Sequence, residues 1–156
     1  SGCLLTLDEL AAEHRFETML DMGCGSGILA IAMAKTWPKG KVLAVDNDPE
    51  SVRVTQQNAL LNGCESNLEA LLSEGFADSK VKAFGLFDVV TANILAKPLC
   101  MMAPDIKVSL KPGGWVILSG LLERQKPQVL DAYEAQGLSL IKTCSIEDWA
   151  TLLLRK

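Results

Sequence analysis

The sequence predicts a single α/β domain built on a doubly wound, mostly parallel sheet, and three observations favour this fold. Short apolar segments alternate with helical patterns along the whole chain, which is the order that strand–helix–strand units produce. Aromatic residues make up only 5% of the chain while Leu and Ala are abundant, a composition that suits helices packed on a parallel sheet. At 156 residues the chain can bury one core without disulfides or metals, so we expect residues 1–156 to form one domain.

The boundaries of the expected elements come from local signals. The segment Trp37-Pro38-Lys39-Gly40 stops one helix, whereas Asp48-Pro49 starts the next as an N-cap residue followed by proline in the first turn. Gly63 is expected to close that second helix. Strands are expected at residues 18–22, 41–46, 67–72, 87–93, 115–120, 138–146 and 149–156, and helices at residues 1–16, 28–35, 49–62, 99–110 and 124–136.

Three features shape the second half of the chain. The helix at 99–110 contains Pro104, which predicts that the helix either breaks there or begins just before it. Residues 110–114, LKPGG, are expected to form a turn. The last two strands are separated only by Glu147-Asp148, which predicts a hairpin and therefore one antiparallel strand in the sheet. Trp115 and Trp149 are expected to pack against that sheet.

Charge and composition exclude several classes of protein. The net charge is −4 and Lys and Arg form no cluster, so direct binding of nucleic acid through its phosphates is poorly supported. No apolar run reaches the roughly 20 residues of a membrane span, and no signal peptide is visible. The cysteines lack the spacing of metal ligands, so we expect no metal site. Their pattern indicates free thiols in a reducing compartment, so we expect a cytoplasmic protein. They are Cys3, Cys24, Cys64, Cys100 and Cys144.

The segment LDMGCGSG carries the strongest functional signal. Gly23, Gly25 and Gly27 follow the first expected strand, where ligands of open α/β sheets bind. A dinucleotide fingerprint has the spacing G-x-G-x-x-G, whereas here the spacing is G-x-G-x-G and Ile28 stands where the third glycine would be. The acid Asp21, just before the turn, repels a pyrophosphate but suits a cation. These features favour S-adenosylmethionine, which carries an ammonium and a sulfonium and no phosphate.

A second acid, Asp46, ends the second expected strand, where a carboxylate can accept hydrogen bonds from both ribose hydroxyls. NAD enzymes share this feature, so it discriminates little by itself. An NAD-linked oxidoreductase therefore stays open as an alternative.

Over residues 2–156 the chain resembles the methyltransferase domain of the ribosomal protein L11 methyltransferases. The resemblance rests on LDMGCGSGILAIAMAK, VLAVDNDPESV and LKPGGWVILSGLLERQ, and more narrowly on FDVVTANILAKPL and LSGLL. It implies a class I, Rossmann-like methyltransferase fold and transfer of methyl groups to lysine and terminal amines of ribosomal protein L11 or a similar protein. Members of this family also carry a threonine-containing glycine-rich segment and a substrate-recognition domain before this region, and neither is in this chain.

The resemblance also implies a role for individual residues. Gly23 and Gly25 would pass under the methionine part of the cofactor, with Asp21 near its ammonium, and Glu74 would lie by the adenine. Asn93 would be the catalytic residue, next to the sulfonium and the incoming amine. The full set expected to bind S-adenosylmethionine, or the product S-adenosylhomocysteine, is Asp21, Gly23, Cys24, Gly25, Gly27, Asp46, Asn47, Glu74, Gly75, Phe76 and Asn93.

Two further alternatives stay open. One is a methyltransferase acting on RNA or a small molecule, although Asn93 is followed by Ile-Leu-Ala and not by a base-stacking aromatic ring. The other is a non-catalytic module that only binds S-adenosylmethionine. The sequence leaves the oligomeric state undefined.

Overall fold

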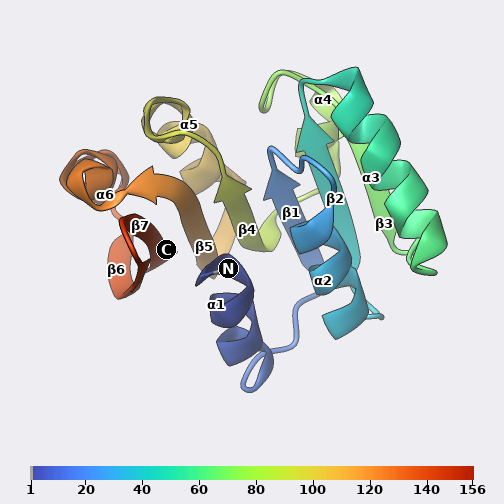
Figure 1. The fold of residues 1–156 in the computed structure, drawn as a ribbon, viewed down its shortest axis with the longest axis horizontal. Coiled ribbons are helices and arrows are strands. Elements are labelled where there is room, and N and C mark those ends of the chain that lie inside the picture. The colour runs from blue at the N-terminus through green and yellow to red at the C-terminus, as the bar shows by residue number, and fades with distance from the viewer. Residues whose placement is uncertain (1) are drawn as a thin grey trace.

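Within residues 2–156, seven strands pair into one sheet, with five parallel strands followed by a C-terminal hairpin (Figure 1). The computed structural model describes residues 2–156. The strands are β1 (Thr18–Met22), β2 (Lys41–Asp46), β3 (Leu68–Leu72), β4 (Phe87–Asn93), β5 (Leu110–Leu122), β6 (Ser139–Ile146) and β7 (Trp149–Arg155). Their order is β3-β2-β1-β4-β5-β7-β6, and β7 pairs antiparallel with both β5 and β6. The predicted fold class, including its one antiparallel strand, is therefore confirmed.

Helices cover both faces of the sheet. One face packs against α1 (Gly2–Ala11), α2 (Ile28–Thr36) and α3 (Pro49–Leu61), and the other against α4 (Ser79–Ala83), α5 (Ala96–Ser109) and α6 (Lys126–Glu134). A short 3-10 helix, η1 (Glu123–Gln125), leads into α6. Right-handed crossovers between parallel strands place helices on both faces in this way. The carboxyl ends of β1, β2 and β4 meet at one edge of the sheet (Figure 1).

Alternation along the strands builds two separate hydrophobic cores. In β1, Met19 packs with the α1–α2 side, whereas its neighbour Leu20 packs with the α5–α6 side, and both are fully buried. Successive side chains of a strand point to opposite faces, so a strand buried on both sides is apolar at most of its positions. Each such side chain contributes roughly 1.5–3 kcal/mol by leaving water. The buried central strands therefore stabilise the edge of the sheet at which their carboxyl ends lie.

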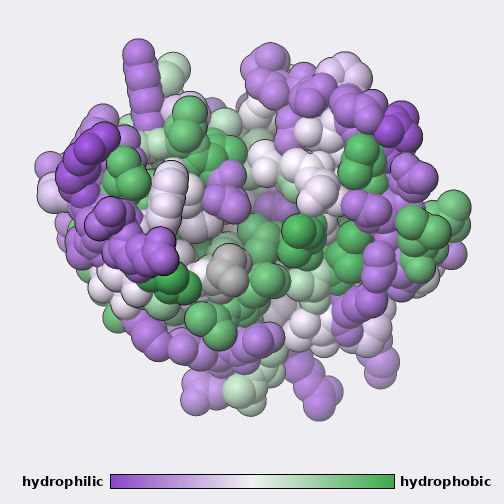
Figure 2. All heavy atoms as spheres, in the orientation of Figure 1, coloured by the Kyte–Doolittle hydropathy of each residue, from purple (hydrophilic) through white to green (hydrophobic). Residues whose placement is uncertain are grey.

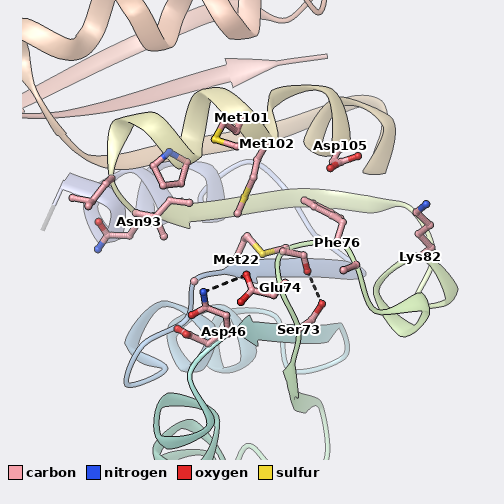
Figure 3. A pocket seen from close by; sticks show the side chains of 17 residues that line it. Met22, Asp46, Ser73, Glu74, Phe76, Lys82, Asn93, Met101, Met102 and Asp105 are labelled. Carbon is pink, nitrogen blue, oxygen red and sulfur yellow. Dashed lines mark hydrogen bonds between the residues drawn. The ribbon is translucent and has the colours of Figure 1, made fainter.

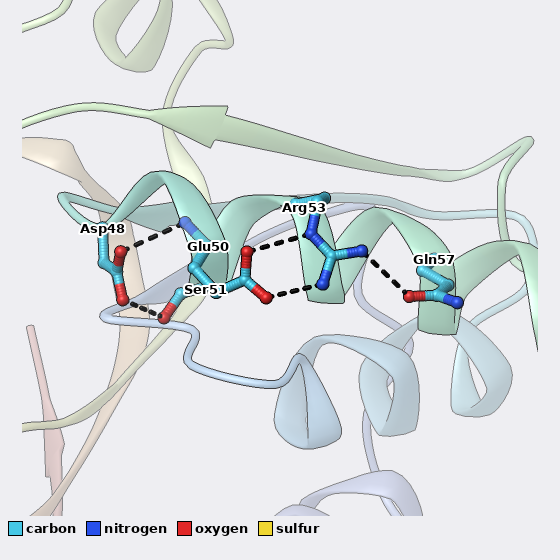
Figure 4. Close-up of polar contacts among 5 residues, drawn as sticks. All are labelled: Asp48, Glu50, Ser51, Arg53 and Gln57. Atoms are coloured by element: carbon cyan, nitrogen blue, oxygen red, sulfur yellow. Dashed lines mark hydrogen bonds and ion pairs between the residues drawn. The ribbon is translucent and has the colours of Figure 1, made fainter.

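The start of α3 shows the capping predicted from Asp48-Pro49 (Figure 4). The Asp48 side chain accepts hydrogen bonds from the Glu50 amide and the Ser51 hydroxyl. Arg53 donates to both Glu50 and Gln57 on the exposed side of the helix. The cap satisfies an amide that has no partner within the helix.

Several expected boundaries were wrong. Helix α5 begins at Ala96 and continues through Pro104, because Leu99, Ala103 and Ile106 hold its buried face against the sheet. That packing outweighs the one backbone hydrogen bond that proline removes. Residues 110–114 belong to β5 and not to a turn, and the short helix α4 was not expected.

The tryptophans that were expected to pack on the sheet differ in exposure. Trp115 is 8% exposed and packs beneath the Arg155 guanidinium, 4.6 Å from the ring centre. Trp149, at the start of β7, is 53% exposed, so its expected packing is wrong. The sequence contains no signal for this difference, because both residues stand in strands.

No helix among residues 2–156 is long and apolar enough to cross a membrane. On the face drawn in Figure 2, hydrophilic residues cover much of the periphery, and hydrophobic residues are exposed nearer the centre.

Candidate functional site

A cavity of about 990 Å³ lies at the carboxyl edge of the sheet. Its floor comes from the ends of β1, β2 and β4, one wall from the segment after β3, and the other from α5 (Figure 3). In Figure 3, Met101 and Met102 of α5 lie on one side, with Asp46 and Glu74 on the opposite side. This position beyond the strand ends is where open α/β sheets bind ligands.

The glycine turn is held to the neighbouring strand by its backbone. The amides of Gly23 and Cys24 both donate to the carbonyl of Val45, at 2.8 and 2.9 Å. The amide of Gly25 donates to Oδ2 of Asp46 at 3.0 Å. These bonds fix the turn against the end of β2, so the backbone of the turn and the Asp46 carboxylate form one unit.

Glycine is required in this turn for two different reasons. At Gly23 a Cβ would lie 2.4 Å from Cγ2 of Ile94, so the close approach of the segment after β4 excludes a side chain. At Gly25 a Cβ would meet no described atom within 4 Å, but φ is +56°, which favours glycine. The space above Gly25 is therefore open to a ligand, and its backbone can be approached closely.

Beneath the turn, Thr55 of α3 makes the supporting contacts. Its hydroxyl donates to the carbonyl of Gly25 at 2.9 Å, and its side chain fills the space beside Gly27. The Cys24 thiol lies 3.4 Å from the same hydroxyl. Burial raises the pKa of Cys24 to about 11, so this thiol stays protonated and is a packing residue and not a nucleophile.

Acidic side chains line the end of the cavity at β2 and β3. Asp46 is held by the amides of Gly25 and Asp48, each at 3.0 Å. Asn47 donates to Oε2 of Glu74 at 3.5 Å, which orients that carboxylate (Figure 3). Both acids line the cavity and can accept hydrogen bonds from hydroxyl or amino groups of a ligand.

Asp21 does not line the cavity. Asp21 lies between Leu20 and Met22 in β1, and side chains alternate between the two faces of a strand. Met22 faces the α5 side and the cavity. Asp21 therefore faces the α1–α2 side. Its Oδ1 accepts from the Thr91 hydroxyl at 2.8 Å, while Oδ2 has no hydrogen-bond partner among residues 2–156. Burial raises the pKa of Asp21 to about 7, although the Thr91 hydrogen bond opposes the shift.

Asn93 stands at the end of β4 with an exposed side chain that borders the cavity. Gly120 of β5 packs against it, since a Cβ at position 120 would lie 2.9 Å from Oδ1 of Asn93 and 2.7 Å from the carbonyl of Ile94. No role for Gly120 was expected from the sequence. Its position in LSGLL was a visible signal, but only the pairing of β4 with β5 explains it.

The structure brings some of the expected cofactor residues together and separates others. Those that line the cavity are Gly23, Asp46, Asn47, Glu74, Gly75, Phe76 and Asn93, and those that do not are Asp21, Cys24, Gly25 and Gly27. Of the second group, Cys24, Gly25 and Gly27 belong to the turn itself, and Asp21 lies on the opposite face of β1 from the cavity. Further lining residues that were not expected are Met22, Ser73, Ala77, Lys82, Ile94, Leu95, Pro98, Met101, Met102 and Asp105.

The charges of the cavity favour a cationic ligand. Its lining contains three acids, Asp46, Glu74 and Asp105, but one base, Lys82, which Figure 3 places at the end away from Asn93. A pyrophosphate would meet the acids, whereas an ammonium or sulfonium would be stabilised by them. Met22, Met101, Met102 and Phe76 add an apolar, polarisable wall that suits a flat aromatic group. No group of three or more metal-ligating side chains occurs among residues 2–156.

Known proteins resemble this chain over its whole length. Residues 1–156 match the family described as ribosomal protein L11 methyltransferase (PrmA). The protein of that name from Agrobacterium fabrum is 44% identical over all 156 residues, and that from Bradyrhizobium diazoefficiens is 46% identical over 155 residues. The chain spans about half the length of these curated relatives, 53% and 52% respectively.

A solved structure shares the fold over almost the whole chain. The crystal structure of ribosomal protein L11 methylase from Lactobacillus delbrueckii subsp. bulgaricus superposes with a TM-score of 0.87 at 32% identity. The match covers 99% of this chain and 77% of that one.

Proposed function

This chain belongs to the ribosomal protein L11 methyltransferase family, and we propose that it is the S-adenosylmethionine-binding, methyl-transferring part of an enzyme that methylates amines of ribosomal protein L11. One observation carries the proposal. Asp46, Glu74 and Asn93 come from three different strand ends or loops and border one cavity whose acids outnumber its bases. That arrangement provides sites for ribose hydroxyls, for an amino group and for a cationic centre.

The residues of the cavity fit S-adenosylmethionine as a cofactor. Asp46 would accept from the ribose hydroxyls and Glu74 from the adenine amine, while Phe76 and the α5 methionines would cover the ring. The open space over Gly25 suits the methionine part. When bound, the cofactor supplies a methyl group on a sulfonium, whose C–S bond breaks as the new C–N bond forms.

Asn93 is proposed as the catalytic residue. The nucleophile must be a neutral amine, whereas a free lysine has a pKa of ~10.4. The Oδ1 atom of Asn93 can accept a hydrogen bond from the amine and so direct its lone pair, and Gly120 leaves room for Asn93 in this position. Positioning of this kind is the main contribution that a protein makes to a displacement reaction.

The test uses the full-length protein with methyl-labelled S-adenosylmethionine and purified ribosomal proteins. Label on ribosomal protein L11, together with calorimetric binding of S-adenosylhomocysteine, is the expected result. Cofactor binding without label on any ribosomal protein would indicate a binding module, and label on RNA alone would indicate the RNA alternative. Tight NAD binding with no binding of S-adenosylhomocysteine would overturn the proposal.

The proposed partner and location follow from the same family. We place the protein in the cytoplasm, with a ribosomal protein as its partner, and all five cysteines are free thiols, as suits a reducing compartment.

A further inference from the structure

A second cavity, of about 560 Å³, adjoins the first. Asn93, Ile94 and Leu95 line both cavities, so this short segment is a common wall between them. The remaining lining residues come from the start of α1, from β5 and from the hairpin of β6 and β7: Gly2, Cys3, Ser119, Gly120, Ile146, Glu147, Trp149, Ala150 and Thr151. None of these residues lines the first cavity.

The fold creates this opening through an irregularity in β5. The register between β5 and β7 shifts between Leu118 and Leu121, which leaves Ser119 and Gly120 without regular partners on β7. The hairpin turn beside this gap is tied down, since the Glu123 amide donates to the carbonyl of Asp148 at 2.8 Å. Irregularities of this kind re-aim side chains at functional sites.

A polar group in the cavity lacks a strong hydrogen-bond partner. Ser119 is 7% exposed, and its hydroxyl has no nitrogen or oxygen partner among residues 2–156; it faces only the Cys3 thiol, which is a weak hydrogen-bonding group. A buried hydroxyl without a strong partner is unfavourable, so a ligand group that hydrogen-bonds to it would be stabilised. The nearby Cys3 thiol has its pKa raised to about 12 by burial, so it remains protonated and is no competing nucleophile.

The mouth of the cavity combines an acid with apolar surface. Glu147 is the one charged residue among the described residues of the lining. Beside it, Trp149 is 53% exposed, and the apolar residues Ile146 and Leu95 are also exposed. An aromatic face next to a carboxylate attracts an ammonium group, and aliphatic surface accommodates the methylene chain of a lysine.

We propose that this second cavity is the acceptor site and takes a lysine side chain of the protein substrate, with Glu147 and Trp149 as specificity-determining residues and Ser119 as a hydrogen-bond partner inside. The inference rests on the proposed function, because the proposed function has the acceptor amine and the cofactor meet at the wall formed by Asn93, Ile94 and Leu95. The lysine enters as an ammonium and releases one proton to solvent before it reacts as the neutral amine. Each transfer leaves a methylated ammonium, so the same acid and ring accept it between successive transfers.

Binding of an amine can be tested without methyl transfer. The full-length protein is labelled with ¹⁵N and saturated with S-adenosylhomocysteine. It is then titrated with n-butylammonium chloride. The indole N–H signal of Trp149, identified by its loss in Trp149→Phe, is expected to shift saturably. Glu147→Gln should weaken this binding about three- to tenfold, whereas Asp148→Asn, the neighbouring acid outside the lining, should leave it unchanged. An indole signal that does not move, or equal effects of the two variants, would overturn the inference.

The second readout separates this inference from the proposed function. In methylation assays, Glu147→Gln and Trp149→Leu should raise KM for the protein substrate about three- to tenfold and leave the affinity for S-adenosylhomocysteine unchanged. Ile141→Ala, an exposed neighbour on β6, is the control. If the wild type binds butylammonium but methylates no ribosomal protein, the proposed function fails and the cavity assignment stands. If the wild type methylates and neither variant changes KM, the cavity assignment is wrong.

Discussion

The carboxylate of Asp46 accepts a hydrogen bond from the amide of Gly25, 3.0 Å away, and so joins the end of β2 to the glycine turn after β1. Its other oxygen accepts from the Asp48 amide at the same distance. One side chain thereby orders the turn and remains available at the edge of the cavity.

Replacement of Asp46 by Ala is therefore expected to weaken binding of S-adenosylhomocysteine at least tenfold. The substitution removes a carboxylate that lines the cavity and also releases the Gly25 amide, and hydrogen bonds to charged groups contribute about 1.5–3 kcal/mol each. Isothermal titration calorimetry measures the change. Asp48→Asn is the matched control, because asparagine also caps a helix and residue 48 does not line the cavity. Equal losses in both variants would contradict the assignment.

Replacement of Asn93 by Ala is expected to reduce kcat for methylation at least tenfold while changing cofactor affinity much less. The side chain is exposed at the end of β4 and borders both cavities, so its loss would remove the proposed positioning of the amine and little packing. Single-turnover kinetics and calorimetry separate the two effects. Asn62→Ala, at the end of α3, serves as the control. Unchanged methylation in Asn93→Ala would remove Asn93 from the catalytic machinery.

Two glycines with the same backbone angle provide a matched pair. Gly120 and Gly137 both have φ of +85°, but a Cβ would clash with Asn93 and Ile94 at the first position and would meet no described atom within 4 Å at the second. Gly137→Ala should cost about 1 kcal/mol of unfolding free energy for the backbone conformation alone. Gly120→Ala should cost roughly 1–3 kcal/mol more for the clash. Urea unfolding measures both, and equal costs would show that position 120 has more room than the structure describes.

The buried Asp21 predicts a pH dependence of stability. Its pKa is raised by burial to about 7, so the folded state binds a proton more tightly than the unfolded state does. The free energy of unfolding should therefore fall as pH rises from about 4 to about 7, and ionisation of Asp21 should cost on the order of 4 kcal/mol above that range.

Asp21→Asn provides the comparison, because the amide stays neutral at every pH. The difference in unfolding free energy between wild type and variant, measured with urea from pH 5 to pH 8, should shift in favour of the variant as pH rises. A difference that stays constant over this range would show that the Asp21 carboxyl has an ordinary pKa.

Local sequence signals predicted the strands at residues 18–22, 41–46 and 87–93, whose bounds the structure reproduces. The cap at Asp48 was equally visible. These features depend on nearest neighbours along the chain, namely β-branched runs, glycine and the capping geometry of Asp-Pro. Where tertiary packing overrides a local preference, as at Pro104 within α5, the prediction failed.

For the candidate site too, the sequence determined some features and the tertiary structure decided others. The sequence by itself determined the alternating fold, the glycine turn and the acids at the ends of β1 and β2. Only the tertiary structure decided that Met22 and not Asp21 faces the cavity, that Gly120 supports Asn93, and that Trp149 is exposed beside a second cavity. The physical reason is that the face a strand residue points to, and the elements that meet it there, depend on strand order and register. Those are set by contacts between residues far apart in the chain.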